Sequence, residues 1–370
     1  MPVNKEALAL VEKINKEMKE RTVVIASEMV VSKRYLTGSL SLDVATGGGW
    51  PANQWVEVLG KESHGKTAMV YKGIAANQAV DPEFTVVWVA AEHYDYEWAT
   101  DLGVDNDRVI VISTRKMEFA YQKVLEFAKS RAIDWIVIDS YPALIPDEEG
   151  EKDMDEFSIG LGARLTGKFF RKAGEATARS MDGSERPMLG IMINQWRDDI
   201  GGFSPRGPAQ TSPGGKGKNY AFYVRVDVRR DEWIDEPLPG QGKIRVGQRI
   251  KVKTIKNKSA APYQIASIDF YFRDAPQSGF SKGDYDEAKE SMTMGILFDV
   301  IERHGAYYSF DGNRWQGKDA MFAAFREDLD MCERLRVKVL EVAKNTVERS
   351  ITEEDITAAE TSGTRTVARR

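Results

Sequence analysis

The chain has 370 residues, of which 42% are hydrophobic and 29% charged, and 52 basic against 57 acidic residues give a net charge of −5. This balance argues against a protein that coats nucleic acid over its whole surface, although it allows local basic loops. The single cysteine, Cys332, excludes an intramolecular disulfide and a multi-cysteine metal site. Apolar runs stay well below the ~20 residues of a membrane span, and the charged N-terminus lacks a signal-peptide core, so we expect a cytoplasmic protein.

The first predicted element is an amphipathic helix over residues 4–20, with Asn4 as a possible cap. It stands apart from the next strand-like stretch, which leaves two interpretations open. The helix packs on the core of its own chain, or it is an arm that docks on a neighbouring subunit. We assign residues 1–34 to an N-terminal oligomerisation helix or arm.

Residues 35–272 alternate short apolar, β-branched runs with helical stretches. The runs lie at 56–60, 85–91, 108–113, 135–140 and 188–194, with helices predicted at 67–79 and 117–131. This alternation predicts an α/β fold with a mostly parallel central sheet covered on both faces. Two irregular segments interrupt it, a first loop at about 147–160 and a second loop at about 197–215. Loops of that length inside a compact domain are usually functional or disordered.

The remainder of the chain differs in character. Residues 273–345 have the pattern of helices with a short aromatic hairpin, whose Asp311-Gly312 pair supplies a tight turn. They predict a small α+β C-terminal domain. From about residue 346 the chain is polar and threonine-rich, so we expect a disordered tail over 346–370.

The strongest local signal is GKESHGKT at 60–67, directly behind an apolar strand and ahead of a predicted helix. This is the pattern of a phosphate loop, whose backbone N–H groups wrap the phosphates of a nucleotide such as ATP. Gly60 and Gly65 permit the turn, while Lys66 neutralises phosphate charge and Thr67 offers a hydroxyl to Mg²⁺. The intervening positions, also assigned to the ATP site, are Lys61, Glu62, Ser63 and His64.

Three polar residues follow apolar strands at the carboxyl edge of the predicted sheet, where ligands collect in α/β folds. Asp139 is expected to hold the Mg²⁺, with a cap or turn as the alternative. Glu92 could activate a water against the γ-phosphate, unless it is an exposed loop acid. Gln195 could sense the γ-phosphate and pass its state to the second loop, unless it is a plain strand-end glutamine.

Basic side chains accompany both loops. Arg164 and Arg171 lie on a predicted helix after the first loop, and Arg197 opens the second, so these residues could bind a phosphodiester backbone. A solvated helix face is the alternative. Lys256 and Lys258 lie two apart on a strand and therefore share a face. They could reach a phosphate supplied by a neighbouring subunit, or simply be exposed at a sheet edge.

Several segments together resemble those of bacterial and phage RecA-family DNA recombinases, in the same order and from the N-terminal helix to about residue 345. They include TGSLSLDVATGGGWP (37–51), GKESHGKT, AEHYD, WIVIDS, INQWR and KNKSAAPY. The AEH and KNKSAAP motifs are specific, because general phosphate-loop proteins lack them.

The resemblance implies a RecA-type ATPase that uses ATP and Mg²⁺ and forms helical filaments on single-stranded DNA. It also implies strand exchange with duplex DNA, coupled to DNA-dependent ATP hydrolysis, in recombination, repair and the SOS response to DNA damage. The alternative is a non-exchanging accessory ATPase that loads or regulates another recombinase. A hexameric helicase on the same core is a third reading.

The resemblance also implies roles for single residues. It matches Glu92, Gln195 and Lys66 to the catalytic set, and Lys256 with Lys258 to lysines that reach ATP across the subunit interface. Further positions implied at the nucleotide are Asp95 and Trp98. The implied DNA contacts are Ile159, Arg164, Arg171, Arg197, Ile200, Gly214 and Gly215. The chain departs from the family at Asn219, where an interface lysine is common, and Lys216 or Lys218 could compensate.

Overall fold

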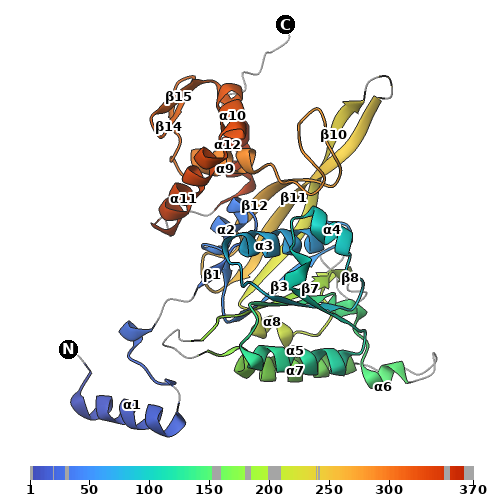
Figure 1. The fold of residues 1–370 in the computed structure, drawn as a ribbon, viewed down its shortest axis with the longest axis vertical. Helices are drawn as coiled ribbons and strands as arrows, with labels where there is room; N and C mark the ends of the chain where they lie inside the picture. The colour runs from blue at the N-terminus through green and yellow to red at the C-terminus, as the bar shows by residue number, and fades with distance from the viewer. Residues whose placement is uncertain are drawn as a thin grey trace.

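The computed structural model describes residues 3–19, 21–29, 33–151, 160–179, 185–198, 210–238, 240, 242–345 and 351–361. Its centre is an eight-stranded sheet in the order β12-β11-β10-β3-β7-β6-β4-β5 (Figure 1). The strands from β10 to β5 run parallel; β11 pairs antiparallel with both β10 and β12, so β11 alone runs in the opposite direction. The prediction of an α/β fold with a mostly parallel sheet is therefore confirmed. The bounds are β3 Gln54–Gly60, β4 Val86–Ala90, β5 Val109–Ser113, β6 Trp135–Asp139, β7 Leu189–Gln195, β10 Val224–Leu238, β11 Gly242–Asn257 and β12 Ile265–Tyr271.

Helices cover both faces of this sheet. Successive strand residues point to opposite sides, and both sets of side chains are apolar and buried against helices. In β4, Val86 and Trp88 face the core that contains α3 and α4, whereas Val87 and Val89 face α5 and α7. Figure 1 shows these two helical layers on either side of the strands. The bounds are α3 Lys66–Val80, α4 Tyr96–Asp101, α5 Met117–Ser130 and α7 Leu161–Thr177.

Short elements complete the core. They are β1 Arg34–Tyr35, α2 Leu40–Thr46, β2 Trp50–Pro51, η2 Asn106–Arg108, η3 Tyr141–Ala143, α6 Asp147–Gly150, β8 Arg197–Asp198, β9 Gln210–Thr211 and α8 Lys218–Ala221. The distal parts of β10 and β11 extend beyond the neighbouring strands as a two-stranded hairpin (Figure 1). In the described ranges of the chain, no helix is both long and apolar enough to cross a membrane.

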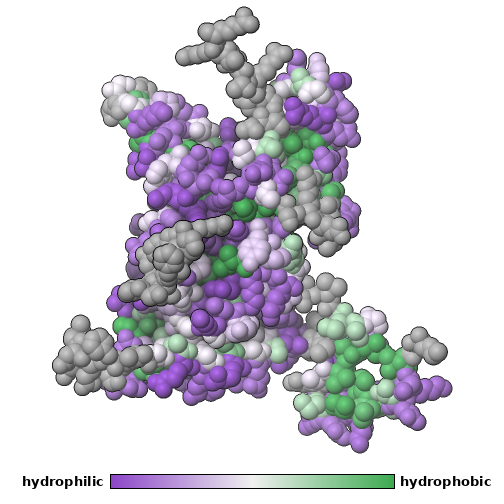
Figure 2. Space-filling model, turned by 180° about the vertical axis from the view of Figure 1, so that it is seen from behind, coloured by the Kyte–Doolittle hydropathy of each residue, from purple (hydrophilic) through white to green (hydrophobic). Residues whose placement is uncertain are grey.

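The N-terminal arm stands away from the sheet. It contains α1 Lys5–Met18 and η1 Ala26–Glu28, and the Asn4 side chain caps α1 by accepting from the Ala7 N–H at 2.8 Å. No residue of α1 is buried, and Leu10 remains 55% exposed. Figure 2 shows the apolar side chains gathered on this detached segment. Helix α1 therefore does not pack on the core of its own chain, and docking on a neighbour stays a prediction.

The C-terminal part forms a separate apolar core around Met292, Phe325 and Leu335. Its elements are α9 Glu287–Leu297, β13 Glu302–His304, β14 Tyr307–Phe310, β15 Asn313–Gln316, α10 Lys318–Glu327 and α11 Leu329–Asn345. The buried Glu290 of α9 accepts from the N–H groups of Leu40 and Ser41, both at 3.1 Å. This carboxylate thus caps the start of α2 and holds the two parts of the chain together.

The expectation of a disordered tail is wrong for residues 353–361, which form helix α12 Glu353–Thr361. Ile351 and Ile356 are buried in the C-terminal core. Glu353 pairs with Lys251 of β11 at 3.2 Å, and the Lys318 ammonium donates to carbonyls at the end of the helix. These contacts fix a segment whose own sequence is polar.

Candidate nucleotide and DNA sites

The phosphate loop, residues 60–67, connects the last residue of β3 to the first turn of α3. Gly65 is the cap of α3 in the left-handed region, with φ of 89°. A Cβ on Gly65 would lie 2.5 Å from Ile250 Cδ1, and one on Gly60 would lie 2.4 Å from the Val228 carbonyl oxygen. Both positions therefore require glycine, because β10 and β11 approach the loop closely.

Lys66 is almost completely buried at the start of α3. Its ammonium donates to the carbonyl of Lys61 at 2.6 Å, inside the loop. Burial lowers the pKa of Lys66, and the nearby carboxylates of Asp139 and Glu92 oppose this shift. The positive charge of Lys66 therefore lies inside the loop that is predicted to bind phosphate.

Asp139 and Thr67 meet beside the loop. The Thr67 hydroxyl donates to Asp139 Oδ2 at 3.1 Å, and Asp139 is 6% exposed. Burial raises the pKa of Asp139 to about 7; Glu92 adds to the shift, whereas the Thr67 hydrogen bond and Lys66 counteract it. A buried carboxylate beside a hydroxyl is an oxygen donor set of the kind Mg²⁺ takes when nucleotide phosphates complete its shell. The residues therefore fit the implied metal.

Glu92 lies at the adjacent strand tip. Ala90 of β4 is in register with Asp139 of β6, and the Glu92 N–H donates to the Asp139 carbonyl at 3.2 Å. The Glu92 side chain is exposed and accepts a hydrogen bond from the Ser140 hydroxyl. The peptide bond between Asp139 and Ser140 is cis. Sequence reasoning did not single out Ser140, which lies next to the predicted metal ligand and contacts the predicted base.

Gln195 ends β7 and is in register with Gly60, so it lies beside the phosphate loop. Its neighbour Asn194 is fully buried and accepts from the Gln195 N–H at 2.9 Å. Asn194 also donates to Glu57 Oε1 at 2.8 Å and to the Pro213 carbonyl at 3.1 Å. The sensor position is thereby tied to β3 and to the end of the second loop.

Other residues predicted at the nucleotide site contact neighbouring groups of the chain. Asp95 caps α4 by accepting from the Trp98 N–H at 2.9 Å. The Trp98 ring packs edge-on against Phe270, with the Lys282 ammonium 5.0 Å from its centroid. His64 lies near the Val228 carbonyl, and burial lowers its pKa. Contacts of Asp95 and Trp98 with a nucleotide stay predictions.

Lys256 and Lys258 lie one strand beyond β10, level with the middle and the first half of β3 rather than with its carboxyl end. Lys256 is in register with Arg225, which pairs with Glu57, and the Lys258 N–H donates to the Tyr223 carbonyl. Glu57 precedes Gly60 by three residues, or about 10 Å along β3. The two lysines and the phosphate loop are therefore separated within one subunit.

The predicted DNA contacts are only partly described. Ile159 and Ile200 lie outside the described residues. Arg164 and Arg171 are exposed on α7, and Arg197 is exposed in β8, which pairs with β9 at the base of the second loop. Gly214 and Gly215 have φ of 100° and 73°, and a Cβ on Gly215 would lie 3.1 Å from Ala163. The structure thus brings Arg164 and the glycine pair together.

Lys218 does not compensate for Asn219 at a subunit interface. Its ammonium is buried inside the subunit, where it contacts Glu57 Oε1 at 2.6 Å. Lys216 is exposed and remains available. Like Ser140, the buried Glu57 and Asn194 are polar groups of this region that no sequence pattern singled out.

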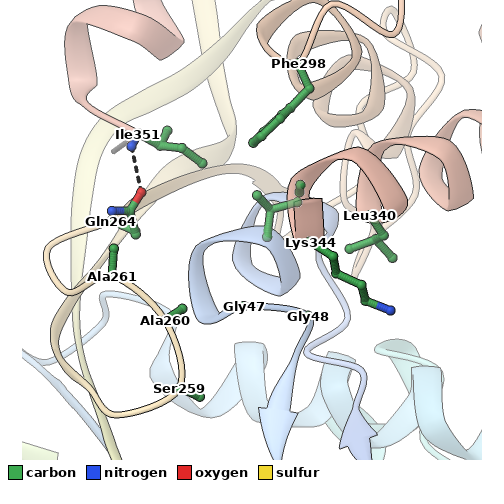
Figure 3. Close-up of a pocket in the computed structure, with 12 residues that line it drawn as sticks. Gly47, Gly48, Ser259, Ala260, Ala261, Gln264, Phe298, Leu340, Lys344 and Ile351 are labelled. Atoms are coloured by element: carbon green, nitrogen blue, oxygen red, sulfur yellow. Dashed lines mark hydrogen bonds between the residues drawn. The ribbon is translucent and has the colours of Figure 1, made fainter. Parts of the chain in front are cut away.

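A cavity of about 180 Å³ lies between the C-terminal domain and the segment that follows Lys258 (Figure 3). Ser259, Ala260 and Leu340 line it. At its rim the Ile351 N–H donates to Gln264 Oε1 at 2.6 Å. Its lining comes from residues 44–48, 259–264, 298, 340–344 and 351 and not from the phosphate loop, so the cavity is distinct from the nucleotide site.

The sheet order, the phosphate loop and the adjoining Thr67–Asp139 pair define a P-loop nucleotide-binding protein. The family model described as the RecA N-terminal domain matches residues 5–276. The chain is 34% identical to Protein RecA of Acidothermus cellulolyticus over 308 residues, which is 82% of each chain. It is 35% identical to Protein RecA of Frankia casuarinae and 34% identical to that of Staphylococcus aureus, with the same coverage. The chain belongs to the RecA family.

Proposed function

We propose that this protein is a DNA-dependent ATPase that forms filaments on single-stranded DNA and catalyses homologous pairing and strand exchange with duplex DNA. Its proposed role is recombination and repair. The observation that carries the proposal is the separation of the two halves of the ATP site. The phosphate loop lies at the carboxyl edge of β3, whereas Lys256 and Lys258 lie level with its middle and first half.

This separation favours assembly in one direction. A surface that carries a phosphate loop and a different surface that carries two lysines are not self-complementary. Such head-to-tail contacts generate open filaments or rings rather than twofold dimers. Burial lowers the pKa of Lys256; Lys258 and Arg225 add to this shift, whereas Glu57 opposes it. Phosphates bound to a neighbouring subunit would bring further negative charge to Lys256.

Each residue of the loop edge has a defined part in the proposed hydrolysis. Thr67 and Asp139 would hold Mg²⁺, which neutralises charge on the phosphates when bound. Lys66 would neutralise further phosphate charge from within the loop. Glu92, exposed at the neighbouring strand tip, would accept a proton from the attacking water, and Ser140 orients its carboxylate.

The DNA contacts would lie next to this edge. Gln195 is beside Gly60, and the second loop begins two residues later. Arg164, Arg171 and Arg197 are exposed around the base of that loop and would bind the phosphodiester backbone. DNA bound to the loop would therefore bias the position of Gln195 and the rate of hydrolysis.

Complementation between two inactive variants tests the shared site. Lys66→Ala damages the phosphate loop, and Lys256→Met/Lys258→Met damages only the pair of lysines. If the site is completed head-to-tail, about a quarter of the interfaces in a random mixture join an undamaged phosphate loop to an undamaged pair of lysines. The mixture should then recover DNA-stimulated hydrolysis. A mixture as inactive as its components contradicts the shared site. Strand exchange without any other recombinase then distinguishes the proposed recombinase from an accessory ATPase.

A further inference from the structure

A buried charge cluster joins the strand of the phosphate loop to the end of the second loop. We call Glu57, Lys218 and Arg225 the Glu57 cluster. Glu57 is fully buried in β3 and accepts from the Lys218 ammonium at 2.6 Å and from Arg225 Nε at 2.6 Å. Lys218 comes from α8 and Arg225 from β10, so the cluster ties three elements together.

The remaining hydrogen bonds of Lys218 go to the chain that leaves the second loop. Its ammonium donates to Ser212 Oγ at 2.8 Å and to Asn219 Oδ1 at 3.2 Å. An ammonium has three donors, so Glu57, Ser212 and Asn219 together saturate it. The Asn219 carbonyl in turn accepts from the Lys256 ammonium at 2.6 Å. One short segment thus contacts the second loop, the phosphate-loop strand and the lysine proposed to act on a neighbour.

The Gly214–Gly215 turn rests on the Lys218 side chain. A Cβ on Gly214 would lie 2.8 Å from Lys218 Cδ and 3.2 Å from Tyr141 Cζ. The left-handed φ of 100° at Gly214 also disfavours any other residue. The lysine stem therefore forms the floor under the turn that closes the second loop.

Neutralising Glu57 does not require Lys218. Arg225 already supplies one positive charge to one carboxylate, so the lysine brings the cluster to a net charge of +1. Two of its three hydrogen bonds reach Ser212 and Asn219 instead. Its contacts are those of a group that holds the loop end in place, rather than those of a charge needed to balance Glu57.

We infer that Lys218 is a positioning residue that fixes the end of the second loop to β3, so that DNA held by the loop and nucleotide held by the phosphate loop affect one another. This link is separate from the one through Gln195. The inference rests on the proposed DNA-dependent hydrolysis. Asn194 supports it from the other side, because it bonds both Glu57 and the Pro213 carbonyl.

The test compares the ATPase of wild type, Lys218→Met and Ser212→Ala across a titration of single-stranded DNA. Met keeps the stem under Gly214 and leaves the Glu57–Arg225 pair intact. For Lys218→Met we expect DNA-free hydrolysis and the KM for ATP to stay within about twofold of wild type. The maximal rate at saturating DNA should fall at least ~5-fold, a typical size for coupling between sites. Ser212→Ala, which removes the loop-side hydroxyl that accepts from Lys218 at 2.8 Å and from Arg225 at 3.5 Å, should lower the same maximum.

Lys129→Met is the matched control. It removes the same charge from an exposed lysine on α5, outside the segment that contains Lys218. A general loss of positive charge would raise the DNA concentration needed but leave the maximal rate unchanged. If Lys218→Met and Ser212→Ala also keep the wild-type maximum, the positioning role is refuted while the proposed function stands. If wild type itself shows no stimulation by DNA, the proposed function fails first.

Discussion

Replacing Glu57 by Gln should destabilise the fold strongly, although the two side chains have nearly the same size. The substitution leaves Lys218 and Arg225 facing each other without an anion, and these side chains are 0% and 13% exposed. Removing one partner of a buried ion pair costs about 3–5 kcal/mol, because the remaining charge is desolvated and uncompensated. We expect a loss of that size in the free energy of unfolding.

Urea unfolding followed by tryptophan fluorescence measures this loss. Glu83→Gln serves as the control, since it makes the same chemical change in a surface pair with Arg186, where the Glu83 side chain is 83% exposed. That change should cost at most about 1 kcal/mol. Adding Lys218→Met to Glu57→Gln removes one of the stranded cations and should recover part of the stability. A Glu57→Gln loss no larger than that of Glu83→Gln would refute the reasoning.

Three further predictions concern other parts of the chain. Glu92→Gln should lower kcat for ATP about 10²–10⁴-fold without abolishing nucleotide binding, as measured by steady-state hydrolysis and nucleotide titration; normal turnover would remove Glu92 as the base. Deleting residues 351–370 uncovers the site of Ile351 and Ile356, each worth about 1.5–3 kcal/mol, so hydrogen exchange in the C-terminal domain should accelerate; unchanged protection would contradict the docked helix. Burial raises the pKa of Asp43 to about 6 despite its ion pair with Arg336, so Asp43 binds its proton more tightly in the folded state. Its contribution to stability should therefore decline by about 2 kcal/mol as pH rises from 4 to 7, a slope that Asp43→Asn should lack in urea titrations.

The sheet and the edge that carries the loop could be predicted because they depend on local signals. Apolar, β-branched runs predict buried strands, and a phosphate loop is contiguous in sequence. The aromatic hairpin is a similar case. Phe310 pairs with Asn313 around Asp311 and Gly312, both with positive φ, as an Asp-Gly turn requires.

Helix α12 could not be predicted, because its stability comes from its surroundings. Its own sequence has few apolar residues and reads as polar. What holds it is Lys251 on a strand about a hundred residues earlier, together with a C-terminal core that buries Ile356. Tertiary contacts here outweigh local composition.

The Glu57 cluster shows a second limit. Glu57 stands in an apolar strand next to the phosphate loop, and nothing in that strand reveals a partner. Lys218 lies 161 residues further along and reads as one more basic residue in a glycine-rich loop. Only the pairing of β3 with β10 and the turn at α8 bring the two charges together.

The most direct test of the account is ATP hydrolysis by the purified protein in Mg²⁺, with and without single-stranded DNA. The account predicts strong stimulation by DNA, since the base of the proposed DNA-binding second loop lies beside the phosphate loop and is connected to it through Gln195 and the Glu57 cluster. Hydrolysis at the same rate in both conditions, or none in either, would contradict a DNA-dependent ATPase and favour the accessory protein instead.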